Sequence, residues 1–423
     1  MKLLIKNSRV IDPANSIDEV ADILVEEGRI IKIAKEINVS AQETIDASGK
    51  IAMPALVDMH VHLREPGRED KETISSATLA ALKGGIGSVL AMANTAPTMD
   101  SCENIRLLKE LIKNSSHVNV YVCAAITKGR SGEELTDIAK LKGEGAVAIS
   151  DDGASLDNEE LLLKALVKAK ECKVLTICHC EDKKLSGAGV INLGLTSTRL
   201  GLRGISKESE YKRVERDVLL ADKSSSPIHI THISCKESVE IIAKAKNKGV
   251  KVTCDSAPHY FSLTEEELIN YDTNLKMNPP LRAKEDVAAI KQGLKDGTID
   301  AIASDHAPHT INEKEIEFER SEFGVIGLET LLAVSISELA APGILSFSEL
   351  VKRIALNPAR ILGIKKGTLS VNSDADIVII DPDKQWLVRK EEIVSKSKNS
   401  AFLGRKLTGV VEYTIVNGRV AYP

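Results

Sequence analysis

No window of this sequence approaches the run of about 20 apolar residues that a membrane-spanning helix needs. The opening MKLLIKNSRVIDP has too short an apolar run for a signal peptide, and charges interrupt it. No long basic run occurs and the net charge is −5, which argues against nucleic acid or an anionic membrane as the main partner. The seven cysteines are scattered and odd in number, which indicates reduced thiols and not a disulfide framework. These features together predict a cytoplasmic protein.

Both ends of the chain are rich in short strand patterns separated by turn residues. Near the N-terminus these are KLLIKNSRVID, ADILVEEGRIIKIAK and ETIDASGKIAM, and near the C-terminus GTLSVNSDADIVIID and YTIVNGRVAYP. The Asn-Gly pair in the last stretch is a hairpin signal. Because 423 residues are many for one compact domain, we predict a small β-domain built from residues 1–53 and 346–423.

Residues 54–345 alternate apolar runs with helical patterns. The runs are ALVDMHVH, SVLAMANT, NVYVCAAIT, AVAISDDG, KVLTICHCED, IHITHIS, VKVTCDSAPH and AIASDHAPH. Helical stretches such as NEELLLKALVKAKE lie between them, and Gly249 and Gly297 close two of these. Eight such units predict an α/β fold, a (β/α)₈ TIM barrel. An open doubly wound sheet is the alternative, and it is disfavoured because no G-x-G-x-x-G follows the first strand.

Metal-binding residue types stand at the ends of the apolar runs. They are His60 and His62, Asn94, Asp151 and Asp152, His179, His232, His259 and Asp305. In a barrel these positions meet at the C-terminal mouth, where barrel enzymes keep their active sites. His60 and His62 point to the same face of one strand because side chains alternate. The set therefore predicts a metal site.

Some of these positions have a simpler interpretation. His117 and His229 are expected to be ordinary hydrogen-bonded groups. Cys178 and Cys180 turn away from the mouth if His179 points into it, so we expect them to pack against helices. Asp151 and Asp152 likewise point opposite ways, and only one can face the site.

The chain resembles the dihydroorotases of the bacterial class I type, in the amidohydrolase superfamily. The resemblance runs over essentially the whole chain, through DMHVHLREPG, MANTAPT, SDDG, HCED, GVINLG, HITHIS, APHYFSLT, MNPPLR, SDHAPH, FGVIGLET and NPARILG. It implies a barrel with a small β-sandwich. Tyr260 in APHYF and Cys235 in HISCK depart from the commoner pattern, and neither is an expected ligand.

The resemblance implies a site for one or two zinc ions. His60, His62 and Asp305 would hold the first ion, and His179 and His232 the second. Many relatives bridge the ions with a carbamylated lysine, whereas this class uses an aspartate, and Asp152 stands at that place. Imidazole and carboxylate ligands suit zinc without excluding manganese or cobalt.

The implied reaction is the reversible closure of N-carbamoyl-L-aspartate to L-dihydroorotate and water, the third step of pyrimidine synthesis. In the hydrolytic direction a zinc-activated hydroxide attacks the ring amide, and Asp305 moves the proton to the leaving nitrogen.

The resemblance also implies a set of substrate contacts. Arg64 offers a planar fork for a carboxylate, and the other implied contacts are His62, Asn94, Asn278, His309 and the backbone at Phe323 and Gly324. For Asn94 and Asn278 the alternative is turn formation beside Pro97 and Pro279. The charged stretch at 309–327 is either a solvated loop, a lid, or both.

Two other functions fit the same pattern. A hydantoinase or allantoinase would typically carry the bridging lysine, which SDDG does not offer, and would not need Arg64 for a free carboxylate. An inactive dihydroorotase-like scaffold for aspartate transcarbamoylase would have lost ligands, and here every ligand position is filled. The expected partners are thus the small-molecule substrate, a second copy in a homodimer and aspartate transcarbamoylase, with no nucleic acid or membrane.

Overall fold

Eight parallel strands form the central sheet of the computed structural model, which describes residues 2–423. They follow one another around the sheet in chain order. The strands are β6 (Leu56–Val61), β7 (Ile86–Ala91), β8 (Asn119–Ala124), β9 (Ala146–Ile149), β10 (Leu175–Cys178), β13 (Ile228–Ile230), β14 (Val252–Ser256) and β15 (Ala301–Ile302). Seven of them lie within the predicted apolar runs, and β7 begins two residues before its run, which starts at Ser88.

The first and last strands of this sheet meet and close it. Val61 pairs in parallel with His306, just beyond β15, and the His62 amide donates to the His306 carbonyl (2.9 Å). Asp58 of β6 accepts the Ser304 amide (3.1 Å). These contacts confirm the predicted (β/α)₈ barrel and exclude the open doubly wound sheet.

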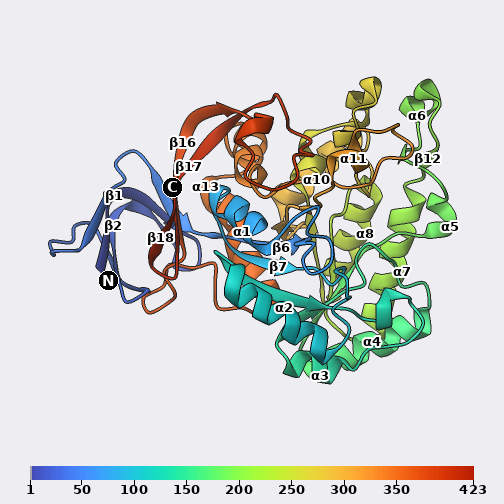
Figure 1. Ribbon diagram of the computed structural model, residues 1–423, viewed down its shortest axis with the longest axis horizontal. Coiled ribbons are helices and arrows are strands. Elements are labelled where there is room, and N and C mark those ends of the chain that lie inside the picture. The colour runs from blue at the N-terminus through green and yellow to red at the C-terminus, as the bar shows by residue number, and fades with distance from the viewer. Residues whose placement is uncertain (1) are drawn as a thin grey trace.

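Helices cover the outside of the barrel (Figure 1). Its main helices are α1 (Ile74–Lys83), α2 (Cys102–Ser115), α3 (Ile138–Gly143), α4 (Glu159–Cys172), α7 (Glu208–Ser224), α8 (Lys236–Asn247) and α10 (Lys284–Asp296). The shorter ones are α9 (Pro258–Ser262), α11 (Ile311–Lys314), α12 (Leu331–Ser335), α13 (Phe347–Val351) and α14 (Asn357–Leu362).

Helix α4 shows how the sequence sets these elements. The Asn158 side chain accepts the Leu161 amide at its N-terminus, Glu159 and Glu160 stand in the first turn, and Lys173 ends it in the left-handed conformation. Leu162, Ala165, Leu166 and Ala169 form its buried face, with the spacing of one side of a helix.

An excursion between β10 and α7 was not predicted. It contains α5 (Lys183–Ser186), β11 (Ile191–Asn192), α6 (Leu195–Leu200) and β12 (Gly204–Ile205), with β11 and β12 paired in parallel. In Figure 1, α5, α6 and β12 lie on the side of the barrel away from both termini.

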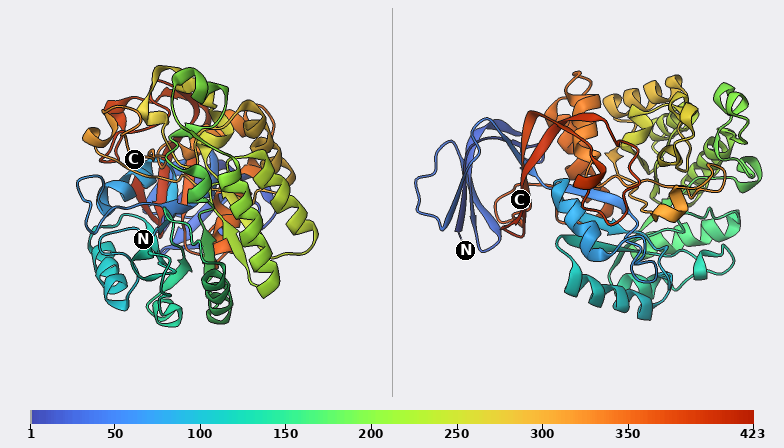
Figure 2. Two further views of the ribbon diagram at one scale, coloured as in Figure 1. Left: turned by 90° about the vertical axis from the view of Figure 1, so that its right-hand side faces the viewer. Right: turned by 45° about the horizontal axis from the view of Figure 1, so that its top comes forward.

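A second sheet is built from both ends of the chain, as predicted. It runs β18-β17-β16-β5-β1-β2-β3, and β4 also pairs with β1. Its strands are β1 (Lys2–Asp12), β2 (Ile17–Glu26), β3 (Arg29–Ala34), β4 (Glu43–Asp46), β5 (Ile51–Pro54), β16 (Ile377–Leu387), β17 (Lys406–Val416) and β18 (Arg419–Tyr422). In the right-hand view of Figure 2 the N-terminal strands of this sheet, in blue, stand apart from the barrel, whereas its C-terminal strands, in red, lie beside the barrel.

The Asn-Gly hairpin forms where the sequence indicates it. Asn417 and Gly418 join β17 to β18 with φ of 50° and 75°, the pair of positive values that a type I′ turn requires. The stretch 367–381, which was predicted as a strand pattern, forms a strand only in its second half. Gly367 (φ 72°) and Asn372 (φ 68°) turn the chain, and β16 begins at Ile377.

The segment that leads from the barrel back to this sheet touches both parts. Helix α13 contacts β1, whereas α14 and the π-helical turn η5 (Lys352–Leu356) contact β6 and β15. The boundaries at 53/54 and 345/346 stay a prediction, and these contacts join residues 352–362 to the barrel. No helix within residues 2–423 is both long enough and apolar enough to cross a membrane.

Candidate metal-dependent active site

The predicted site residues converge on one cavity of about 330 Å³ at the C-terminal ends of the barrel strands. The residues that the resemblance assigns to metal or substrate all line it except His60, which is buried deeper: His62, Arg64, Asn94, Asp152, His179, His232, Asn278, Asp305, His309, Phe323 and Gly324. Asp151 and His259, which also stand at strand ends, do not line it. Arg130, Gly153, Lys183, Ala307 and Glu322 line it as well and were not predicted.

Imidazoles and carboxylates crowd together at the floor of this cavity. His60 Nε2 lies 3.2 Å from Asp152 Oδ2 and 3.6 Å from Asp305 Oδ1. His62 Nε2 lies 3.4 Å from the same Asp305 oxygen. Two buried groups have ligand atoms within 4.8 Å of one another, His60–Asp152–His232 and His60–His62–Asp305.

His179 stands beside these two groups. Its Nδ1 lies 3.0 Å from His232 Nε2 and 3.6 Å from Asp152 Oδ1. Two ring nitrogens at that distance need a proton or a cation between them. Asp152 thus faces ring nitrogens from three strands, β6, β10 and β13, as a bridging ligand would.

The charges of the cluster favour a cation. His60 Nε2 is buried and has no hydrogen-bond partner. Burial disfavours a protonated His60, but Asp152, Asp305 and Asp255 outweigh this and raise its pKa to about 10. Burial alone would also raise the pKa of Asp152, yet the imidazoles hold it well below its usual range. The donor set therefore fits a divalent metal ion.

Hydrogen bonds behind the rings fix which nitrogen faces the cluster. The Thr231 hydroxyl gives its one proton to Asp255 (3.1 Å) and so accepts from His60 Nδ1 (2.7 Å). His62 Nδ1 donates to Asn94 Oδ1 (2.8 Å), and His179 Nε2 to Glu181 Oε2 (3.3 Å). The opposite nitrogen of each ring keeps its lone pair for a metal.

Asp255 on β14 was not predicted. It connects the residues that lie behind the histidine rings. Its carboxylate accepts from the His232 amide (2.7 Å), from Thr231 and from His229 Nε2 (2.8 Å). His229 is therefore an ordinary hydrogen-bonded group, as expected. Asp255 lies inside β14, one residue before its end, so the pattern of polar residues that follow the strands does not single it out.

The residues set aside earlier lie away from the cluster. Asp151 accepts the Ile126 amide (2.8 Å) and the Thr127 hydroxyl (2.5 Å). The Cys180 thiol faces Asp217 (3.4 Å) on α7. His117 contacts Ser75 near the surface (3.1 Å).

The other wall of the cavity carries Arg64 and His309. Arg64 Nε donates to the Pro308 carbonyl (3.1 Å), and its Nη2 lies 3.4 Å from His309 Nε2. His309 Nε2 also lies 2.8 Å from the Phe323 carbonyl. Asn278 Nδ2 donates to Glu181 (3.0 Å).

Two buried lysines hold the 309–327 stretch against this wall. Lys276 Nζ donates to the carbonyls of Phe318, Glu319 and Ser321 at 2.6–3.0 Å. Lys314 Nζ donates to the carbonyls of Lys276, Glu322 and Gly324 at 2.8–3.3 Å. Gly324 has φ of 129°, and a Cβ there would approach His309 Nε2 to 3.0 Å. The stretch is thus a firmly anchored wall of the cavity.

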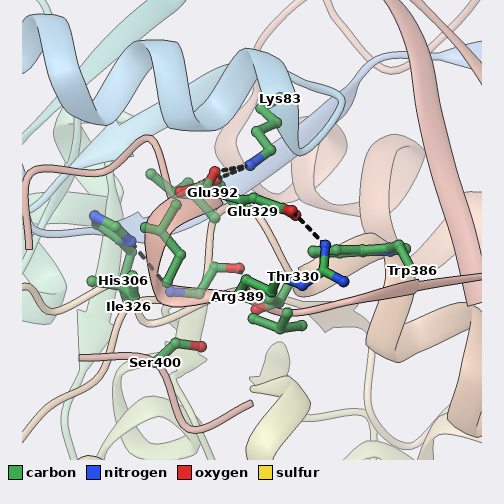
Figure 3. A pocket seen from close by; sticks show the side chains of 13 residues that line it. Lys83, His306, Ile326, Glu329, Thr330, Trp386, Arg389, Glu392 and Ser400 are labelled. Atoms are coloured by element: carbon green, nitrogen blue, oxygen red, sulfur yellow. Dashed lines mark hydrogen bonds and ion pairs between the residues drawn. The ribbon is translucent and has the colours of Figure 1, made fainter. Parts of the chain in front are cut away.

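A second, smaller pocket lies where the C-terminal segment meets the barrel (Figure 3). Lys83 pairs there with Glu329 (2.9 Å), and Arg389 with Glu392 (2.8 Å). Its volume is about 10 Å³, room for one water at most. It is a packing junction and not a second active site.

A barrel with this metal-ligand cluster at its mouth defines the class of protein, a metal-dependent cyclic amidohydrolase. L-Hydantoinase (dihydropyrimidinase) from Arthrobacter aurescens superposes with a TM-score of 0.90 at 26% identity, over 99% of this chain and 95% of that one.

Comparison of the sequence with known proteins identifies one family within this class. A family model described as "Dihydro-orotase-like" matches residues 49–238. Dihydroorotase from Elusimicrobium minutum (strain Pei191) is 51% identical over 99% of this chain and 97% of its own length. Dihydroorotase from Geobacter metallireducens (strain ATCC 53774 / DSM 7210 / GS-15) is 51% identical over the full length of both. The chain belongs to the dihydroorotase family.

Replacing Thr231 with valine should weaken metal binding. The change keeps the shape of the side chain but removes the acceptor for His60 Nδ1, and loss of such a partner typically costs about 10–100-fold in metal affinity. Metal retention against a competing chelator measures it. Thr176→Val is the matched control, because the buried Thr176 hydroxyl has no hydrogen-bond partner. Equal retention by both variants would contradict this account of Thr231.

Proposed function

We propose that this chain catalyses the reversible cyclisation of N-carbamoyl-L-aspartate to L-dihydroorotate and water. One observation carries the proposal: the metal-ligand cluster and the Arg64–His309 pair face the same cavity. One wall suits the reacting carbonyl and the other suits a free carboxylate, and dihydroorotate carries both groups. The wider role is a step in pyrimidine synthesis, in the cytoplasm.

The proposed metal is zinc, as one or two ions. His60, His62 and Asp305 would hold one ion, His179 and His232 the other, with Asp152 between them. When bound, zinc lowers the pKa of a water molecule and polarises a carbonyl group. Four neutral imidazoles with carboxylates are ligands that zinc accepts.

Asp305 is the proposed proton shuttle. Burial alone would raise its pKa, but His62, His60 and His232 hold it well below its usual range, so it starts as a base. In hydrolysis it takes the proton of the attacking water and passes it to the leaving ring nitrogen. In synthesis the protonated carboxyl group helps a substrate carboxylate oxygen leave as water.

The proposed substrate contacts follow the other wall. The Arg64 guanidinium binds the carboxylate with its planar fork, and Asn94 and His309 assist. Asn94 also orients His62 (2.8 Å), so the same amide links metal and substrate. Asn278 and the backbone at Phe323 and Gly324 are the proposed ring contacts. A homodimer and an association with aspartate transcarbamoylase remain part of the proposal.

A hydantoinase activity is the second candidate, favoured by the likeness in fold. Two features oppose it. Asp152 stands where a bridging lysine would, and Lys183, which lines the cavity, is 53% exposed and pairs with Glu181 (2.5 Å). Arg64 would also have no carboxylate to bind in hydantoin.

The test is a steady-state assay of the purified, metal-loaded protein with L-dihydroorotate, hydantoin and allantoin. We expect hydrolysis of dihydroorotate, and its formation from N-carbamoyl-L-aspartate in the reverse direction. Turnover of hydantoin or allantoin above that of dihydroorotate would overturn the proposal. No turnover of any substrate by zinc-replete protein would favour the inactive scaffold.

Asp305→Asn should lower turnover by about 10²–10⁴-fold, as loss of a general acid–base group does. Asparagine suits the test because Asp305 has φ of 49°, a conformation that asparagine tolerates. The kcat for dihydroorotate and the metal content are measured together, with the exposed Asp383→Asn as control. A kcat within a few-fold of the parent would remove Asp305 from the proton path.

Reconstitution of the apoprotein with zinc should not depend on bicarbonate. A lysine bridge must first react with carbon dioxide, whereas Asp152 is already anionic, because its pKa lies well below the usual range. Activity is compared after zinc loading in carbon-dioxide-depleted buffer and in buffer with bicarbonate. A bicarbonate requirement, or full zinc content and turnover in Asp152→Ala, would rule out Asp152 as the bridge.

A further inference from the structure

Lys71 is a buried cation that the proposed chemistry does not use. It lies between β6 and α1 and is 6% exposed. Its Nζ lies 3.1 Å from His309 Nδ1 and 2.9 Å from Glu313 Oε1. Glu313 also pairs with Arg68 (2.9 Å), so its carboxylate keeps a cation without Lys71.

The contact with Lys71 determines where His309 carries its proton. An ammonium group offers only hydrogens, so His309 Nδ1 must present its lone pair to it. The proton of the neutral ring is then on Nε2, which lies 2.8 Å from the Phe323 carbonyl, an acceptor. The two contacts require the same tautomer. Burial, Arg64 and Lys71 also lower the pKa of His309, in keeping with a neutral ring.

The other tautomer has two partners of its own, although its Nε2 lone pair would then face the Phe323 carbonyl oxygen 2.8 Å away. Nδ1–H could donate to Glu313 Oε2, 3.5 Å away. The Nε2 lone pair would then face Arg64 Nη2, 3.4 Å away, and accept from it. That arrangement would engage the Arg64 fork and turn a lone pair toward any carboxylate bound there.

We propose that Lys71 is a positioning residue: it holds His309 as the Nε2–H tautomer, whose one proton is shared between the Phe323 carbonyl and the substrate carboxylate, so that His309 and Arg64 both donate to that carboxylate. The inference rests on the proposed function, because it takes the carboxylate to bind between these two groups. Lys71 itself does not touch the substrate. Its effect reaches the substrate through His309.

Kinetics of two variants test the first consequence. Lys71→Met removes the donor at similar length, and we expect KM for dihydroorotate to rise at least about tenfold, as for a lost hydrogen bond to a charged group, with a smaller change in kcat. Lys71→Arg keeps a donor-only cation and should recover part of the loss. Arg68→Gln is the matched control: it removes the other cation at Glu313 without touching His309, and KM should stay at the parent value.

A double-mutant cycle separates positioning from general packing. If Lys71 acts through His309, Lys71→Met should change KM little in a His309→Gln background. Equal effects of Lys71→Met in both backgrounds, or an unchanged KM in the single variant, would overturn the proposal.

The tautomer itself can be read by long-range ¹H–¹⁵N NMR of histidine-labelled protein, with His309 assigned from the His309→Gln spectrum. We expect a protonated Nε2 in the parent and a shift toward protonated Nδ1 in Lys71→Met. Protonated Nδ1 in the parent would refute the inference. Because this readout needs no substrate, parent protein with the expected tautomer but no dihydroorotate turnover would count against the proposed function alone.

Discussion

Two carboxylates and four imidazoles are buried within a few ångströms of one another, and the site depends on the positive charge that this arrangement requires. Asp152 and Asp305 both face His60 Nε2, at 3.2 and 3.6 Å. Buried carboxylates at this spacing repel unless a cation stands between them. A divalent ion would supply that charge, and the barrel brings the candidate ligands together from separate strands.

Residues around the cluster fix the orientation of the histidine rings that face it. Thr231, Asn94 and Glu181 each hold one ring nitrogen of a histidine and leave the other free. On the opposite wall, buried lysines position the neighbouring groups. Lys276 and Lys314 donate to backbone carbonyls of the 309–327 stretch, and Lys71 lies against His309. Both walls of the cavity are thus shaped by supporting groups, of which only Asn94 is also a proposed substrate contact.

The sequence predicts the barrel and the floor of the cavity because both depend on local pattern. Seven of the eight apolar runs carry His, Asp or Asn at their ends, and parallel strands bring such ends to one mouth. The supporting shell depends on contacts between distant segments. Lys71 and His309 are 238 residues apart in the chain, and Asp255 reaches His229 and His232 from a neighbouring strand. The excursion at 183–207 was missed because its strands have two residues each, too few to show a period.

The central claim is that Asp152 and the histidines bind metal at the barrel mouth without a modified lysine. Anomalous diffraction from zinc-loaded crystals tests it most directly. The account predicts zinc at about 2.0–2.2 Å from His60 Nε2, His62 Nε2 and a carboxylate oxygen of Asp152 or Asp305. Zinc bound elsewhere, or a carbamylated lysine in place of Asp152 at the metal, would contradict it.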